Sequence, residues 1–272
     1  MYKLLLVSDR EEVLSAFSQI DNWELIGFKP PHIRHDFEGT IDSLQKHHAD
    51  GIAIAVEPAE EEQIINYLTA YYPNIAIFEA GRDPEEVLRY LSELKILLNR
   101  IHADFSNDNF GTTDILQECR HEFFRKLMKG KVQSKEDLRR NMRLLRSKMD
   151  ADKPCILVRL VQPAQDDDKL EGRWHYGSEQ LEYALRKAFA GDVKGLHILP
   201  TVSASGEILI LACPLHAVET QVDEEDIAEV VQAHIDEGIR HLSEYKGLDL
   251  SISGIRVLPA LYALCGDANI EI

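Results

Sequence analysis

Two predicted strands in the first part of the chain end at polar segments whose residue types suggest phosphoryl chemistry. The first strand (MYKLLLV) runs directly into Ser8 and Asp9, and the second (GIAIAV) is followed by Glu57. Carboxylates at the ends of neighbouring parallel strands lie at one sheet edge, where they can hold Mg²⁺ or accept a phosphoryl group. The second strand, however, closes with Ala55 and Val56, whose hydrocarbon side chains cannot form an acyl phosphate. The residues therefore indicate a phosphate-handling layout without its acceptor.

The segments that would position these residues alternate between strand and helix. Hydrophobic patterning predicts strands at 1–7, 23–28, 51–56 and 74–78, and helices at 10–20, 40–48, 59–72 and from residue 84 onward. The last helix has a clear start, because Asp83 precedes Pro84 and two glutamates. Strands separated by helices predict a parallel sheet with helices on both faces.

The last part of the chain has a different order of elements. Strands are predicted at 154–161, 196–202, 207–213 and 248–258, and helices at 177–189 and 223–245. Ser203–Gly206 has the composition of a hairpin turn between the second and third of these strands. The order strand, helix, strand, strand, helix, strand predicts a ferredoxin-like α+β domain.

A basic helical connector is predicted between the two parts. Helical periodicity covers residues 113–128 and 134–149, and the second helix follows a capping box that begins at Ser134. Residues 113–150 contain eleven Lys or Arg and six Asp or Glu, whereas the whole chain has a net charge of −17. The connector is therefore the one region in which a basic patch is segregated from an acidic chain.

The connector carries two candidate interaction surfaces. The cationic face of its second helix consists of Arg139, Arg140, Arg143 and Arg146. This face could contact nucleic acid or an acidic partner; the alternative is a face that is solvated or that pairs with acids of its own neighbours. The apolar residues of the first helix could pair with a second copy, which predicts a homodimer: they are Leu116, Phe123, Phe124 and Leu127.

Composition limits the class of protein. A chain of 272 residues, 44% hydrophobic and 28% charged, is long enough for two modest globular domains. No apolar run approaches the roughly 20 residues of a membrane helix, and the amino-terminal segment lacks the cleavage site of a signal peptide. The four cysteines are far apart in the sequence and form no CxxC pair. These features predict a cytoplasmic protein with free thiols and no membrane association.

His32, His35 and Asp36 form one further cluster of polar side chains. Two imidazoles and a carboxylate could ligate zinc. The cluster follows Pro30 and Pro31, and the pattern predicts no helix that would hold the three side chains together. A polar loop is therefore the preferred interpretation.

Several segments resemble a known family of regulators. KLLLVSDREEVL resembles the opening of response-regulator receiver domains, and ADGIAIAVEP resembles their third strand. HEFFRKLMKGKVQSKEDL, PCILVRLV and YGSEQLEYALRKAF resemble the middle region of AraC-type response regulators, a helical connector followed by a degenerate GGDEF-like, cyclase-related domain. The resemblance implies an α/β chain with a receiver-like (flavodoxin-like) domain at 1–103, a connector at 104–151 and a ferredoxin-like, degenerate GGDEF-like domain at 152–272.

The chain departs from the receiver pattern at the phosphorylation site. The resemblance implies two acids after the first strand, an acceptor acid after the third, a hydroxyl residue after the fourth and a later Lys-Pro pair. The remnants in this chain are Ser8, Asp9, Ala55, Val56, Glu57 and Glu79. Asp9 is the one candidate metal ligand, and a hard cation wants several oxygen ligands at once. We expect no phosphoryl acceptance, no catalytic residue and no cofactor, Mg²⁺ included.

The chain departs from the cyclase-related pattern as well. Its hairpin reads Ser203-Ala204-Ser205-Gly206 in place of the GGDEF signature, and Gln162-Pro163 follows the first strand in place of metal-binding acids. Asp166–Asp168 comes later, in a predicted loop whose acid run has the character of a solvated surface. An AraC-type regulator would also continue into helix-turn-helix motifs, whereas this sequence stops at Ile272.

Three functional hypotheses follow. The favoured one is a non-enzymatic signalling protein of transcriptional regulation in a two-component setting, switched by a ligand or by a protein partner such as a sensor kinase. DNA contact would then require a module that is not in this chain. The second is a fragment of a DNA-binding AraC-type response regulator whose helix-turn-helix lies beyond Ile272. The third is a nucleotide-binding or cyclase-like enzyme with residual activity in the last domain.

Overall fold

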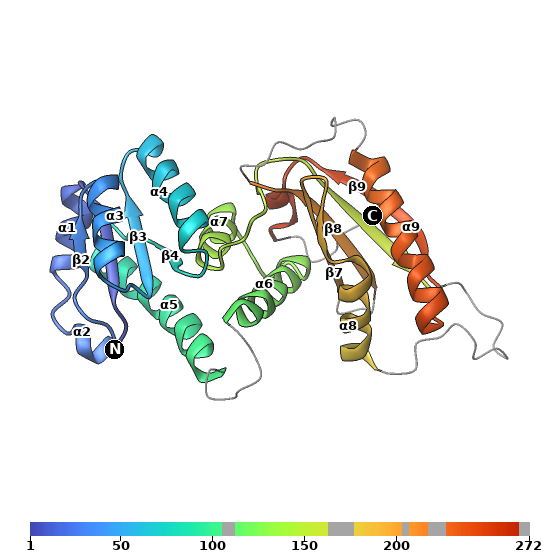
Figure 1. Cartoon of the computed structure of the whole chain (residues 1–272), viewed down its shortest axis with the longest axis horizontal. Helices are drawn as coiled ribbons and strands as arrows, with labels where there is room; N and C mark the ends of the chain where they lie inside the picture. The colour runs from blue at the N-terminus through green and yellow to red at the C-terminus, as the bar shows by residue number, and fades with distance from the viewer. Residues whose placement is uncertain (105–111, 163–176, 203–206, 217–226, 267–272) are drawn as a thin grey trace. The chain divides into compact units, whose positions relative to one another are not determined.

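The chain forms two compact units with separate sheets. The computed structural model describes all residues except 105–111, 163–176, 203–206, 217–226 and 267–272 (Figure 1). The first unit comprises residues 1–120 and 140–147, and the second comprises residues 121–139 and 148–272. The division therefore passes through two helices, α6 (Thr112–Met128) and α7 (Lys135–Leu144).

The first unit is built on a parallel four-stranded sheet in the order β2-β1-β3-β4. The strands are β1 (Leu4–Ser8), β2 (His32–Arg34), β3 (Gly51–Ala55) and β4 (Ala76–Glu79). Ser8 pairs with Ala55, so the ends of β1 and β3 lie in register. The apolar runs of β1 and β3 are almost fully buried, as expected for a parallel sheet covered on both faces.

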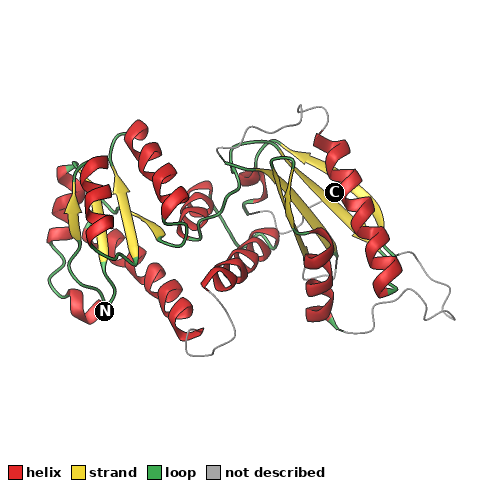
Figure 2. Cartoon of the chain, viewed as in Figure 1, coloured by secondary structure: helices red, strands yellow, loops and turns green. Residues whose placement is uncertain are grey.

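Helices cover both faces of this sheet (Figure 2). On one face, α3 (Phe37–Lys46) and α4 (Pro58–Tyr71) contribute Leu44, Ile64 and Leu68 to a core with β1 and β3. The other face is covered by α1 (Glu11–Ser18) and α5 (Pro84–Asp104), which contact each other. The predicted start of α5 is confirmed, because the Asp83 carboxylate accepts the N–H groups of Glu85 and Glu86.

The predicted strand at 23–28 is wrong. The segment forms a short helix, α2 (Trp23–Ile26), which ends at Gly27 with a left-handed φ of 91°. Its apolar side chains pack locally instead. The Trp23 ring stacks on Phe17, and the side chain of Phe28 is fully buried. The real second strand, β2, lies beyond the prolines at the sheet edge, and its largely exposed residues give no hydrophobic run.

The second unit is built on an antiparallel five-stranded sheet in the order β6-β7-β8-β5-β9. The strands are β5 (Cys155–Val161), β6 (Gly191–Val193), β7 (Leu196–Val202), β8 (Ile208–Pro214) and β9 (Ser251–Leu258). Two helices, α8 (Ser178–Phe189) and α9 (Ile227–Lys246), pack on one face through a core that includes Phe189 and Ile235. The predicted strands are confirmed, and the three-residue β6 was not predicted.

The connector differs from its prediction at the end of its second helix. The second connector helix, α7, begins after Ser134, whose hydroxyl accepts the Asp137 N–H, but it ends at Leu144 rather than near residue 149. Arg146 beyond it has a left-handed φ of 54°, which breaks the helix. The apolar residues of the first connector helix are buried at 6% exposure or less, and pairing with a second copy stays a prediction: Leu116, Phe123, Phe124 and Leu127.

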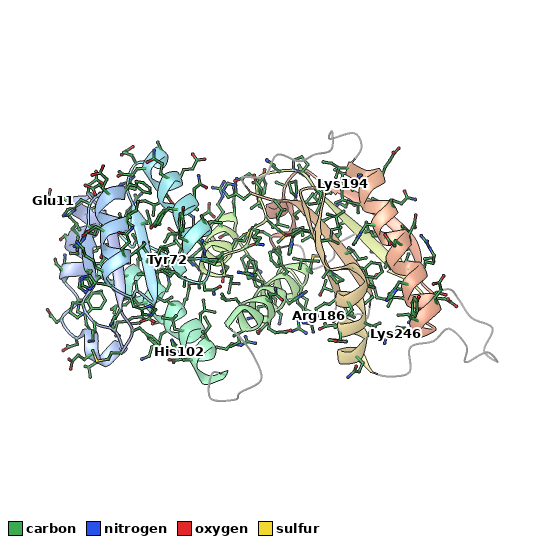
Figure 3. The ribbon with its side chains drawn as sticks, in the orientation of Figure 1. Glu11, Tyr72, His102, Arg186, Lys194 and Lys246 are labelled. Carbon is green, nitrogen blue, oxygen red and sulfur yellow. The ribbon has the colours of Figure 1, made fainter. Side chains whose placement is uncertain are left out.

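Charged side chains cover the outside of both units. Glu11, Lys194 and Lys246 are exposed on the helices and turns that carry them (Figure 3). Among the helices of the described segments, none combines the length and apolar character that a bilayer crossing requires.

Candidate functional site

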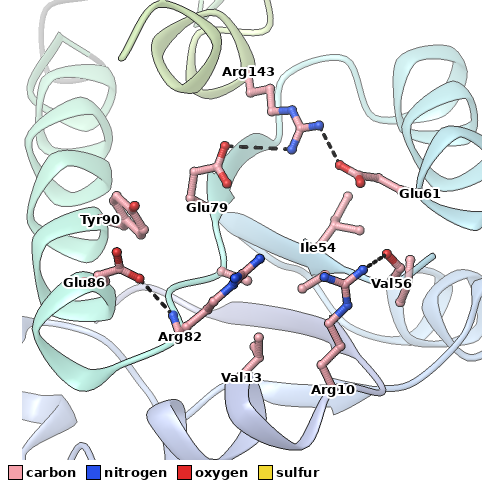
Figure 4. A pocket seen from close by; sticks show the side chains of 12 residues that line it. Arg10, Val13, Ile54, Val56, Glu61, Glu79, Arg82, Glu86, Tyr90 and Arg143 are labelled. Atoms are coloured by element: carbon pink, nitrogen blue, oxygen red, sulfur yellow. Dashed lines mark hydrogen bonds and ion pairs between the residues drawn. The ribbon is translucent and has the colours of Figure 1, made fainter. Parts of the chain in front are cut away.

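The carboxyl ends of β1, β3 and β4 surround a cavity of about 360 Å³ in the first unit (Figure 4). The strand order reverses between β1 and β3, because β2 lies on one side of β1 and β3 with β4 on the other. Crevices outside the carboxyl ends of strands at such a reversal are the usual ligand sites of open α/β sheets. The position of this cavity therefore makes it the leading candidate site.

Ser8 links β1 to β3 at the carboxyl ends of the two strands. The fully buried Ser8 hydroxyl donates to the Ala55 carbonyl at 2.9 Å and accepts the Arg10 N–H at 3.1 Å. On its other side, the Ser8 carbonyl lies 2.8 Å from Nδ1 of His35. A serine oxygen can both donate and accept, and both capacities are used here.

Three arginines line the cavity from three different elements. Arg10 follows β1, and its Nη2 donates to the Val56 carbonyl at 2.8 Å. Arg82 follows β4, and its Nε lies 3.7 Å from a carboxylate oxygen of Glu12. Arg143 comes from α7, more than sixty residues later in the chain.

Three glutamates line the same cavity, and each already has a hydrogen-bond or ion-pair partner. Arg143 pairs with Glu61 at 2.7 Å and with Glu79 at 3.8 Å. Glu86 accepts the backbone N–H of Arg82 at 3.0 Å. The lining is thus balanced in formal charge, and Arg143 neutralises much of its acidic side.

Gly81 allows the start of α5 to approach β4 closely. A Cβ atom on Gly81 would lie 2.7 Å from the backbone nitrogen of Val87, so any side chain would force the first turn of α5 away. The close approach brings the start of α5 against the end of β4. Arg82, Glu86 and Tyr90 thereby join the lining of the cavity.

The six receiver-site remnants do not all reach this cavity. Ala55, Val56 and Glu79 line it, and Ser8, which is not among its described lining residues, donates to the carbonyl of Ala55. Asp9 and Glu57 are exposed and are not among its described lining residues. The lining contains residues that we did not predict: Arg10, Arg82, Glu61, Glu86 and Tyr90. Arg10 and Arg82 could have been found, since each follows a predicted strand by three or four residues.

The predicted cationic face is engaged within each unit. In the first unit, Arg140 pairs with Glu93 at 3.1 Å, and Arg143 pairs with Glu61 and Glu79. In the second unit, Arg139 and Lys135 both bind Asp152, and their hydrogen bonds lower the pKa of that carboxyl. These contacts favour the alternative in which the basic face pairs with neighbouring acids.

Arg146 and Arg120 form a second cationic cluster in the first unit. Burial lowers the pKa of Arg146 to about 10, and the nearby Arg120 guanidinium adds to the shift. Arg146 donates to the Thr69 hydroxyl at 3.1 Å, and Arg120 donates to the Leu145 carbonyl at 2.7 Å. Both hydrogen-bond acceptors are neutral. Among the described residues, the two arginines therefore hold the segment after α7 in place through hydrogen bonds and not through ion pairs.

The predicted histidine cluster does not converge on one point. His32 stacks on His47, His35 contacts the Ser8 carbonyl, and Asp36 caps α3 by accepting the Gly39 N–H. Contrary to the predicted loop, His32 lies in strand β2. Within the described part of the chain, no three His, Cys, Asp or Glu side chains come together as metal ligands would.

The second unit places two thiols together that lie far apart in the sequence. Cys155 and Cys213 are both buried, on the neighbouring strands β5 and β8. Burial, together with the Cys155 thiol, raises the pKa of Cys213 well above its usual range. The Cys213 thiol is therefore a protonated core residue rather than a nucleophile. Asp166–Asp168 and the hairpin at 203–206 lie outside the described residues.

Comparison with known proteins gives no further guide to the site. Neither the protein-family models nor the curated protein sequences contain a match to this chain.

Proposed function

We propose that this protein is a non-enzymatic signalling regulator whose first unit is a receiver-like module without a phosphoryl acceptor. The strand order β2-β1-β3-β4 with helices on both faces supports a flavodoxin-like origin of this unit. In the second unit, the order β7-β8-β5-β9 with α8 and α9 on one face supports a ferredoxin-like, degenerate GGDEF-like domain.

One observation carries this proposal more than any other. At the carboxyl end of β3, where an acceptor carboxylate would stand, Ala55 and Val56 face the cavity and the Arg10 guanidinium binds the Val56 carbonyl. A hydrocarbon side chain offers no oxygen for an acyl phosphate. An arginine in this place also repels the Mg²⁺ that a cluster of carboxylates would hold.

Regulation would then depend on binding instead of phosphorylation. A ligand or protein partner shifts a conformational equilibrium only if it binds one of two arrangements more tightly than the other. In this proposal the cavity is the input site, a cytoplasmic two-component pathway of transcriptional regulation is the setting, and a sensor kinase or another protein is the partner.

We expect incubation with acetyl phosphate and Mg²⁺ to leave the intact mass of the protein unchanged. Mass spectrometry of the full chain measures this directly, with a receiver domain that retains its acceptor aspartate as the positive control. A stoichiometric phosphoryl adduct that disappears in Asp9→Ala would overturn the proposed function.

A further inference from the structure

We infer that the cavity at the carboxyl ends of β1, β3 and β4 binds a small phosphate-bearing molecule between Arg10 and Arg82. The inference rests on the proposed function, because it names the class of ligand to which the first unit would respond. The cavity lies where the strand order reverses, and its volume of about 360 Å³ is that of a small-molecule site.

Arg10 supplies the first group of donors. Its Nη2 donates to the Val56 carbonyl at 2.8 Å, which holds the guanidinium at the end of β3. A guanidinium has five N–H donors in a fixed planar fork. Among the described residues Arg10 has no carboxylate partner, so the remaining donors can bind a ligand. Figure 4 shows this side chain pointing into the cavity.

Arg82 supplies the second group from the β4 side. Its guanidinium also points into the cavity (Figure 4). Its ion pair with Glu12 spans 3.7 Å, with side chains 71% and 57% exposed. Exposed pairs of this kind are worth about 0–1 kcal/mol, so a ligand can replace Glu12 at little cost.

The acids of the lining do not compete for these donors. Arg143 engages Glu61 and Glu79, and Glu86 accepts the Arg82 backbone N–H. The donors left over belong to two guanidinium groups that come from different strand ends. A carboxylate is satisfied by one guanidinium fork, whereas a phosphate has enough oxygens for two. The geometry therefore favours a phosphate group.

Calorimetric titration of the full chain with inorganic phosphate tests the inference. We expect saturable binding at one site, weakened about tenfold or more in Arg10→Gln and in Arg82→Gln, because each removes a charge-assisted hydrogen bond. Lys46→Gln is the matched control, since Lys46 is exposed on α3, pairs with Asp42 and carries the same charge. The affinity of the Lys46→Gln variant for phosphate should equal that of the wild type. The exposure of Arg82 makes loss of folding an inadequate explanation for its effect.

Three results would overturn the inference. They are no saturable phosphate binding, equal binding in wild type and both arginine variants, and tighter binding of acetate than of phosphate. Each is independent of the acetyl phosphate experiment. A covalent adduct together with arginine-dependent phosphate binding would overturn the proposed function and leave the inference standing, whereas no adduct and no binding would overturn the inference alone.

Discussion

Ser8→Asp is expected to destabilise the first unit by about 3–5 kcal/mol, although it restores an acid that a phosphorylatable receiver-like site would need. Ser8 is fully buried, and its hydroxyl must donate to the Ala55 carbonyl. A carboxylate has no proton to donate, so it would face that carbonyl as a second acceptor in a buried place. The guanidinium of Arg10, two residues along the chain, is held by the Val56 carbonyl.

Urea unfolding measures this effect if the first unit is observed by itself. Trp23 is buried in α2 of that unit, so its fluorescence in a Trp174→Phe background is a suitable probe. Ser8→Ala is the matched control and should cost only about 1–3 kcal/mol, because it removes hydrogen bonds without adding charge. The loss in Ser8→Asp should shrink at acidic pH, since a protonated carboxyl can donate to Ala55. An aspartate variant as stable as Ser8→Ala at neutral pH would contradict this account.

Gly238→Ala should destabilise the second unit by about 1–3 kcal/mol, even though alanine favours helices by about 1 kcal/mol over glycine. Gly238 lies on the buried face of α9, and a Cβ atom there would be 2.4 Å from Cε1 of Phe189 on α8. Phe189 is itself fully buried, so its ring has no solvent-exposed space to enter. The two helices therefore approach as closely as they do only because residue 238 has no side chain.

Labelling of the Cys213 thiol in increasing urea reports the unfolding of this unit, because the thiol is buried and its pKa is raised by burial. Gln232→Ala, on the exposed side of α9, is the control and should be nearly neutral. In the double variant Gly238→Ala with Phe189→Leu, the smaller side chain removes the overlap. Its loss of stability should be less than the sum of the single losses. Strict additivity would show that the two residues do not clash.

In the first unit, the sheet could be predicted where the strands are buried. LLLV of β1 and IAIA of β3 are buried on both faces, so their apolar runs are visible in the sequence. β2 is a three-residue edge strand with exposed side chains, and it has no such run. The strand predicted at 23–28 is wrong because apolar residues such as Trp23 also form short helices that pack on a neighbouring helix.

The candidate site could be predicted only in its position. The predicted strand ends lie within one residue of Ser8, Ala55 and Glu79, whereas a phosphorylation site built from acids does not predict the arginines that follow these strands. The role of Arg143 could not be predicted, since α7 is distant in sequence from Glu61 and Glu79. The end of α7 could not be predicted either. The chain turns at Arg146 in a left-handed conformation, which arginine rarely adopts.

The central claim is that the first unit binds phosphate without becoming phosphorylated, and a ³¹P NMR spectrum of the protein with acetyl phosphate and Mg²⁺ tests it most directly. We predict that the free phosphate resonances broaden in the wild type and stay sharp in the Arg10→Gln, Arg82→Gln double variant, with no new resonance in either. A new resonance from a protein-bound acyl phosphate would contradict the account.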